Sequence, residues 1–282
     1  MILITVDSPL RTQNPCGEAL MALEQFKLDG QVAIVTGAGR GVGEGIAKVL
    51  AEAGATIVGT ARTSSEVEAT VKDIELAGGT GLALTADALK RSDSERVVQT
   101  AVDKFGRIDI VVNNVGFATY GPFLSLTDDN LRQTFDYCVT SAFIMSQLAV
   151  PHMLKVGRGS IVNISSGAGR FGIRGLLPYS VAKGGLEALT RAMAQELAPK
   201  IRVNAIALGA FMTTGLQSSF DLMPGSEEKL KELTPLHRIG DVADLGRLTL
   251  YLSTRDCYAT NSTFIVDGGL QGPNSSLPIP DL

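Results

Sequence analysis

The chain has 282 residues, which is enough for one large α/β domain or two small ones with a substantial core. Apolar residues make up 45% and charged residues 19% of the sequence, a balance that is typical of a folded globular protein and excludes a disordered chain. The formal net charge of -4 and the lack of any Lys/Arg run argue against nucleic acid as a partner, because a phosphate backbone requires a concentrated basic surface.

Apolar periodicity divides the chain into alternating strands and helices. Continuous apolar runs predict buried strands at residues 31–37, 55–61, 81–87, 108–116, 159–166, 201–210 and 261–269. Helical spacing predicts helices between them at residues 44–54, 64–79, 93–106, 127–157, 179–199 and 242–254. This alternation predicts one doubly wound α/β domain over residues 28–271, with a seven-stranded parallel sheet covered on both faces. An N-terminal extension, 1–27, and a tail, 272–282, flank it.

A glycine-rich turn, TGAGRGVG, follows the first strand and opens the first helix at residues 36–43. A tight turn of this kind needs residues without a Cβ, which adopt positive φ and let the backbone approach a pyrophosphate. The helix N-terminus then offers oriented N–H groups to the anion. Because of its position between strand and helix, we interpret the turn as a dinucleotide site rather than as a flexible glycine turn. Its candidate binding residues are Gly37, Gly39, Arg40, Gly41, Val42 and Gly43.

The end of the second strand indicates which dinucleotide is bound. An acidic residue there would bind the adenosine ribose of NAD and repel a 2′-phosphate, but this strand ends in Ala61 and Arg62, with no carboxylate before Glu66. Arg40 lies in the glycine turn, and two guanidiniums at one corner suit a phosphate better than a diol. We therefore predict NADP(H) as the cofactor; the alternative is two solvated surface arginines.

Tyr179 and Lys183 are the candidate catalytic pair. Residues four apart share one helix face, and an ammonium beside a phenol favours the phenolate, which makes proton exchange easier at neutral pH. Ser166 lies thirteen residues earlier, at the end of a predicted strand, where its hydroxyl can hold a substrate oxygen. The alternative is one exposed aromatic and one exposed cation. A serine at a strand end and a GxxxGxG turn at the first strand favour the catalytic interpretation.

Taken together, these motifs resemble those of the short-chain dehydrogenase/reductase family, in its tyrosine-dependent single-domain form, over about residues 28–270. The further matching motifs are Asp87 after the third strand, NNVG at 113–116, Thr213 after the sixth strand and VDGG at 266–269. The resemblance implies a Rossmann-type three-layer sandwich with strand order 3-2-1-4-5-6-7, and a homotetramer. It also implies cofactor contacts by Asp87, Ala88, Asn114, Gly116, Tyr179, Lys183, Phe211 and Thr213. In these contacts Asp87 would face the adenine, Lys183 would bind the nicotinamide ribose, and Thr213 would hold the carboxamide.

Two positions depart from the family pattern. Cys138, in FDYCVTSAF, stands where the family usually has an asparagine that holds a proton-relay water, and a thiol is a weaker hydrogen-bond partner. We expect turnover to survive, because Ser166, Tyr179 and Lys183 are all present. Leu208 stands where a proline commonly precedes a glycine, and its effect would be a looser loop without loss of a chemical group.

The long connection at 211–236 predicts a lid over the substrate, with apolar side chains that include Phe211, Met212 and Phe220. An apolar pocket under a lid favours a hydrophobic ketone or secondary alcohol. The sequence therefore predicts an NADP(H)-dependent oxidoreductase acting on CH–OH groups. Two alternatives stay open: a non-catalytic NADP(H)-binding sensor or scaffold, and a reductase of 3-oxoacyl thioesters.

The remaining features concern partners and compartment. The stretch CVTSAFIMSQLAVPHML is apolar on nearly every side, which predicts a homotetramer or dimer interface or simple burial. Three cysteines, far apart in the sequence, favour neither a disulfide framework nor a metal site, and His152 and His237 lack ligand-spaced partners. The first twenty residues hold an apolar run too short to span a bilayer and no basic leader, so we expect no membrane partner and a cytoplasmic protein.

Overall fold

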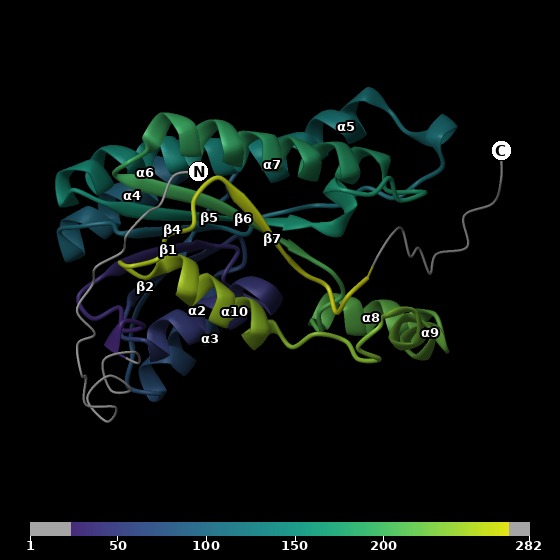
Figure 1. Cartoon of the computed structure of the whole chain (residues 1–282), viewed down its shortest axis with the longest axis horizontal. Helices are drawn as coiled ribbons and strands as arrows, with labels where there is room; N and C mark the ends of the chain where they lie inside the picture. Colours follow the sequence, from purple (N-terminus) through teal and green to yellow (C-terminus); the bar gives the residue numbers. More distant parts are fainter. Residues whose placement is uncertain (1–23, 271–282) are drawn as a thin grey trace, which may run out of the picture.

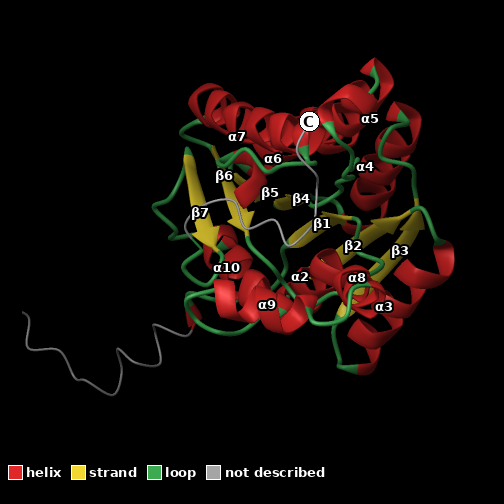
Figure 2. Cartoon of the chain, turned by 90° about the vertical axis from the view of Figure 1, so that its right-hand side faces the viewer, coloured by secondary structure: helices red, strands yellow, loops and turns green. Residues whose placement is uncertain are grey.

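The computed structural model describes residues 24–270, and the extension and tail expected at the two ends lie largely outside this range. Its centre is a sheet of seven parallel strands in the order β3-β2-β1-β4-β5-β6-β7 (Figures 1 and 2). The strands are β1 (Val32–Thr36), β2 (Thr56–Ala61), β3 (Thr80–Thr85), β4 (Ile110–Asn113), β5 (Gly159–Ser166), β6 (Ile201–Leu208) and β7 (Ser262–Val266). The predicted fold class and strand order are confirmed.

Helices cover both faces of the sheet and make three layers (Figure 1). One layer holds α2 (Gly41–Glu52), α3 (Ser64–Leu76) and α10 (Val242–Ser253). The opposite layer holds α4 (Arg91–Phe105), α5 (Asp128–Phe135), α6 (Ser141–Val156) and α7 (Leu177–Leu197). Within the described residues, no helix is both long and apolar enough to cross a membrane.

The core has two main parts, one on each face of the sheet. Side chains alternate along β1, so Ala33 and Val35 pack with α2 and α10, while Val32 and Ile34 pack with α4 and α6. All five residues of β1 are buried, which explains why its sequence is a continuous apolar run. Each fully buried aliphatic side chain contributes about 1.5–3 kcal/mol by leaving water.

The helix expected at 127–157 is interrupted in the structure. Thr127 caps α5 in a reciprocal capping box with Asn130, and α5 ends at Phe135. A π-helical turn, η2 (Asp136–Thr140), follows before α6 begins. The expectation of one regular helix was therefore wrong at this turn, which inserts an extra residue into the helical hydrogen-bond ladder.

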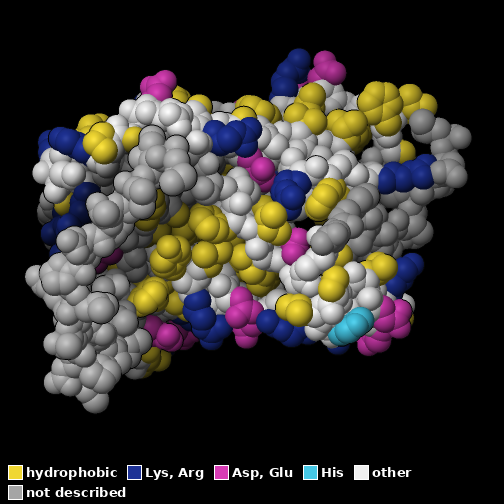
Figure 3. Space-filling view, in the orientation of Figure 1, with side chains coloured by type: hydrophobic (Ala, Val, Ile, Leu, Met, Phe, Trp, Pro, Cys, Tyr) yellow, Lys and Arg dark blue, Asp and Glu magenta, His cyan; other side chains and the backbone are white. Residues whose placement is uncertain are grey.

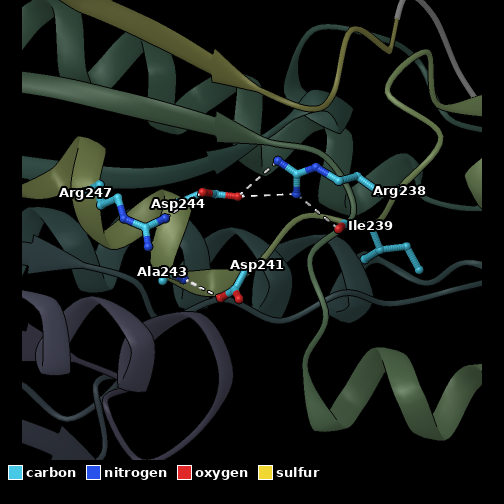
Figure 4. Close-up of polar contacts among 6 residues, drawn as sticks. All are labelled: Arg238, Ile239, Asp241, Ala243, Asp244 and Arg247. Atoms are coloured by element: carbon cyan, nitrogen blue, oxygen red, sulfur yellow. Dashed lines mark hydrogen bonds and ion pairs between the residues drawn. The ribbon is translucent and has the colours of Figure 1, made fainter.

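The connection expected at 211–236 contains two short helices, α8 (Thr214–Leu222) and α9 (Ser226–Leu233), which lie beyond the end of the sheet (Figure 1). Polar contacts hold the chain where it returns to α10 (Figure 4). Asp244 accepts from Arg238 at 3.5 Å and from Arg247 at 2.9 Å, and Asp241 caps α10 at the backbone N–H of Ala243. These contacts tether one end of the α8–α9 segment to the domain.

Candidate active site

The glycine turn lies at the carboxyl end of β1 and is built by close backbone approach. Gly37 and Gly41 have positive φ values of 65° and 60°, which favour glycine. A Cβ at Gly43 would overlap the carbonyl oxygen of Gly37 and would lie 2.5 Å from Asn114 Nδ2. Asn114 Nδ2 donates to the carbonyls of Thr36 and Gly37, both at 3.1 Å, and so ties the turn to the end of β4. The turn is a rigid cradle that a side chain would fill.

Helix α2 starts in this cradle without a side-chain cap. Arg40, at the N-cap position, makes no side-chain hydrogen bond to the first turn of α2. The first N–H groups of this twelve-residue helix therefore have no intrahelical acceptor, and they point to where an anion would bind.

A cavity of about 260 Å³ extends from this turn along the ends of β2, β3 and β4. Seven of the predicted cofactor residues line it: Gly37, Gly39, Arg40, Arg62, Ala88, Asn114 and Gly116. Sequence reasoning missed one aromatic residue of the lining, Tyr137, whose ring centre lies 5.6 Å from that of Phe117. The sequence does not indicate that Tyr137 lines a cavity, because the residues around it are typical of a helix.

The two predicted arginines line the same cavity but turn to different partners. Arg40 Nη1 lies 3.7 Å from Glu66 Oε1, in an exposed and therefore weak ion pair. Arg62 Nη1 donates to the hydroxyl of Tyr137 at 2.9 Å. The structure therefore places both guanidiniums in the lining of one cavity, next to the end of β2, without bringing them into contact with a shared group.

Asp87 stabilises the loop after β3. Its backbone N–H donates to Asp93 Oδ2 at 2.8 Å, and its own carboxylate accepts from the N–H of Leu89 at 3.1 Å. The hydrogen bond from the Asp87 N–H, followed by the interaction with Arg96, holds the pKa of Asp93 below its ordinary value. This loop presents Ala88 to the cavity, while Asp87 lies beside the lining.

Tyr179 and Lys183 lie on successive turns of α7, with the Lys183 Nζ 5.5 Å from the centre of the Tyr179 ring. Lys183 is only 2% exposed, and its Nζ donates to the carbonyl of Ile164 at 2.7 Å. In the described part of the chain no ion pair joins Lys183 to a carboxylate. The pair is therefore a phenol next to a buried cation with unused donors.

Ser166 is the last residue of β5, and the turn that follows it packs against α7, the helix that carries Tyr179 and Lys183. Its Oγ accepts from the N–H of Ala168 at 3.2 Å. Three residues after Ser166, Gly169 packs so closely on α7 that a Cβ at this position would lie 2.8 Å from the carbonyl carbon of Lys183. The close approach at Gly169 draws the Ser166 segment against the catalytic helix, so the structure brings together the elements that carry Ser166, Tyr179 and Lys183.

Cys138 lies next to Lys183, in the π-helical turn η2. Its side chain is 1% exposed, and its Sγ donates a weak hydrogen bond to the carbonyl of Phe117 at 3.7 Å. A Cβ added at Gly116 would lie 3.3 Å from Lys183 Nζ and 3.8 Å from Cys138 Sγ. The thiol and the ammonium therefore both lie against Gly116, in the loop after β4.

Thr213 and Phe211 have different environments. Thr213 caps α8 by accepting from the N–H of Leu216 at 3.1 Å, and its methyl carbon lies 3.2 Å from where a Cβ of Gly41 would be. It is thus close to the glycine turn. Phe211 is buried and packs its ring on Gly240, so its side chain belongs to the core.

The loops after β4 and β5 bring further side chains near α7. Tyr120 is 60% exposed, and partial desolvation, followed by the neighbouring Tyr179, raises its pKa above the ordinary value of a tyrosine. A second cavity, of about 580 Å³, lies between these loops and is lined by side chains that include Phe123, Ile173 and Val181. Among residues 24–270, no group of three or more His, Cys, Asp or Glu side chains is arranged to hold a metal ion.

Comparisons with known proteins agree with this geometry. A family model described as enoyl-(acyl carrier protein) reductase matches residues 37–271. An uncharacterized oxidoreductase of Mycobacterium tuberculosis is 40% identical over 267 residues, which cover 93% of this chain and 100% of that protein. A 3-oxoacyl-[acyl-carrier-protein] reductase of Synechocystis is 34% identical, over 86% and 98% of the two chains. The solved structure of a 7α-hydroxysteroid dehydrogenase complexed with NADH and 7-oxo glycochenodeoxycholic acid has a TM-score of 0.84 at 33% identity, over 89% and 98%.

Proposed function

Because the chain belongs to the short-chain dehydrogenase/reductase family, a family of oxidoreductases that use a nicotinamide cofactor, we propose that it is an NADP(H)-dependent enzyme that interconverts a hydrophobic ketone and its secondary alcohol. The observation that carries this proposal is the arrangement of Tyr179 one helical turn from the buried ammonium of Lys183, on a helix packed against the segment that follows Ser166.

The chain's own residues fit a dinucleotide. The turn at Gly37, Gly41 and Gly43 is packed too closely for side chains, which lets its backbone approach a pyrophosphate, and the start of α2 supplies N–H donors. Ala88, Asn114 and Gly116 would line the adenosine and ribose, and Lys183 and Thr213 would hold the nicotinamide half. When bound, the nicotinamide accepts or delivers the hydride.

The catalytic residues then handle the substrate oxygen and its proton. Ser166 Oγ donates a hydrogen bond to the oxygen and orients it beside the phenol. Tyr179 Oη gives its proton to that oxygen in reduction and takes it back in alcohol oxidation. The Lys183 ammonium stabilises negative charge on the phenol, because it is buried and has no carboxylate partner in the described chain.

The preference for NADP(H) is supported by charge at the adenosine end of the cavity. Arg40 and Arg62 both line it, and the residue after Ala61 is a cation rather than the carboxylate that would bind a free ribose diol. Glu66 opposes this preference, but it is paired with Arg40 at 3.7 Å, and a 2′-phosphate would compete with it as the stronger anion.

A hydrophobic substrate is supported by the 7-oxo glycochenodeoxycholic acid named in the 7α-hydroxysteroid dehydrogenase structure. The 3-oxoacyl thioester of the Synechocystis relative is the alternative within the same chemistry. The substrate lid would comprise about residues 211–236 of a domain spanning 28–271.

We also propose a homotetramer or dimer. Hydrophobic side chains gather near the middle of the face shown in Figure 3, over the region where Figure 1 places α10 and β7. Tyr251 on α10 and Ile265 on β7 are exposed, and so are Phe135 and Phe143 on the opposite layer. Exposed apolar side chains on both layers suit contacts with further copies of the chain.

The experiment is to follow NADPH and NADH absorbance with the purified protein and a panel of diketones, cyclic and steroid-like ketones, and 3-oxoacyl thioesters. We expect turnover with NADPH and a hydrophobic ketone. Arg62→Ala should raise the Kd of NADPH far more than that of NADH, whereas the exposed Arg247→Ala should change neither. Equal weakening of both cofactors would contradict the NADP(H) preference. Tight NADPH binding without turnover across the panel would favour the sensor or scaffold instead.

A further inference from the structure

Tyr137 makes three contacts at the mouth of the cofactor cavity. Its hydroxyl accepts a hydrogen bond from Arg62 Nη1 at 2.9 Å. The guanidinium carbon of Arg62 lies 5.4 Å from the centre of the Tyr137 ring, within the range of a cation–π interaction. The same ring contacts Phe117 at 5.6 Å with an interplanar angle of 47°. Tyr137 is therefore held from two sides and lies in the lining of the cavity.

The order of strands in the sheet shows which part of the site lies between Arg62 and Tyr137. Arg62 directly follows β2, whereas Tyr137 lies in η2, in the segment between β4 and β5. Strand β1 lies between β2 and β4, and neighbouring strands are about 4.8 Å apart, so the contact spans a distance of roughly 10 Å across the carboxyl end of β1. The glycine turn leaves β1 at this point. Arg62 and Tyr137 thus bridge the adenosine end of the cavity.

The π-helical turn explains why Tyr137 reaches this position. Cys138, the next residue in the turn, lies against the loop after β4, and the Lys183 ammonium lies against Gly116 of the same loop. The backbone carbonyl of Tyr137 accepts from Ser141 Oγ at 2.6 Å, which stabilises the turn. Two consecutive residues of η2 therefore lie at opposite ends of the site: Tyr137 lies at the adenosine end, and Cys138 lies at the end that carries Lys183.

We propose that Tyr137 is a positioning residue for NADP(H): its hydroxyl holds the Arg62 guanidinium across the adenosine end of the cavity, ready for the 2′-phosphate. The inference rests on the proposed function, because it assumes that Arg62 binds that phosphate. A guanidinium has five N–H donors, and the contact with Tyr137 uses one side of the fork, so Nε and Nη2 stay available for phosphate oxygens.

The contact favours binding in two ways. A free arginine side chain loses rotamer entropy when it is fixed on a ligand, and here Tyr137 has already restricted that freedom. The Tyr137 ring adds a second restraint, because the guanidinium carbon of Arg62 lies 5.4 Å from its centre. NADH has a hydroxyl in place of the 2′-phosphate, so the position of Arg62 has little effect on its binding.

The test compares wild type with Tyr137→Phe, which keeps the ring and removes the acceptor. Dissociation constants of NADPH and NADH are measured by direct titration, without substrate, and Tyr258→Phe, at a fully exposed tyrosine, is the matched control. We expect the Kd of NADPH to rise about fivefold, the net scale of one exposed hydrogen bond, while the Kd of NADH and the melting temperature stay unchanged. The control should match wild type for both cofactors.

A double-mutant cycle separates this inference from the proposed function. If Tyr137 acts through Arg62, adding Tyr137→Phe to Arg62→Ala should have no further effect on NADPH binding. An unchanged Kd in Tyr137→Phe, a loss that NADH shares, or additive losses in the double variant would overturn the role of Tyr137 while Arg62 remains the phosphate ligand. If Arg62→Ala itself weakens both cofactors equally, the NADP(H) assignment fails, and the inference fails with it.

Discussion

Lys183 provides a test in which stability and activity should change in opposite directions. Its ammonium is 2% exposed, and its contacts in the free protein are one hydrogen bond to the Ile164 carbonyl and the approach to the Tyr179 ring. Burying an ammonium costs several kcal/mol, and one charge-assisted hydrogen bond offsets about 1.5–3 kcal/mol of this cost. The folded protein without cofactor therefore contains a buried charge that is only partly compensated.

Replacing Lys183 by Met removes the charge and keeps a long, apolar side chain of similar shape. We expect Lys183→Met to stabilise the cofactor-free protein by about 2 kcal/mol, within the range measured when buried charges give way to apolar side chains. For a domain of this size that is a rise of roughly 4–8 °C in melting temperature. Turnover should fall by at least about 10²-fold, because the charge that favours the phenolate is gone.

The assay is thermal unfolding with and without NADPH, together with steady-state kinetics. Lys48→Met is the matched control, because Lys48 on α2 is 36% exposed and pairs with Glu44 at 2.7 Å and Asp73 at 2.9 Å. Its loss should cost about 1 kcal/mol or less and leave turnover unchanged. A lower melting temperature for cofactor-free Lys183→Met than for wild type would refute the reasoning, since the buried ammonium would then be a net structural contributor.

Three further outcomes can be measured on the same protein. Tyr179→Phe should lower kcat by about 10²–10⁴-fold in steady-state assays without changing the NADPH Kd measured by titration, and near-normal turnover would remove Tyr179 from the mechanism. Gly43→Ala should abolish cofactor binding in the same titration, because its Cβ would overlap the Gly37 carbonyl oxygen; wild-type affinity would show that the cradle is not used. The pKa of Asp93 is lowered in the folded state, chiefly by the N–H of Asp87, so its contribution to stability is complete above the ordinary value of 3.8 and is lost as the pH falls through the lowered pKa. Denaturant unfolding should therefore show Asp93→Asn less stable than wild type at pH 6, with the difference shrinking toward pH 3, and a pH-independent difference would contradict this.

Local sequence pattern was sufficient for the architecture. A strand buried on both faces must be apolar at every position, and β1 is buried along all five residues, so its continuous apolar run predicted a central parallel strand. The glycine turn was predictable for a similar reason. Only glycine tolerates the positive φ at Gly37 and Gly41 and the close packing at Gly43. The sequence therefore has glycine at these positions, and its spacing can be recognised.

The π-helical turn at Asp136–Thr140 could not be predicted in this way. A π-helical turn has almost the same local residue preferences as the α-helix around it, and the stretch reads as one continuous helix. What places it is packing: Cys138 contacts the loop after β4, and Tyr137 contacts Arg62 from the end of β2. These partners are distant in the sequence, so no short stretch of the chain contains the residues that determine where the π-helical turn forms.

By itself, the sequence determined the order of strands and helices, the glycine turn and the spacing of Tyr179 and Lys183, because each depends on the backbone or side-chain chemistry of neighbouring residues. Only the tertiary structure decided that Arg62 turns to Tyr137 while Arg40 turns to Glu66, and that Lys183 is a buried cation without a carboxylate in the described chain. The physical reason is that the direction of a long polar side chain, and the hydration of a charge, depend on groups that folding brings together from different strands.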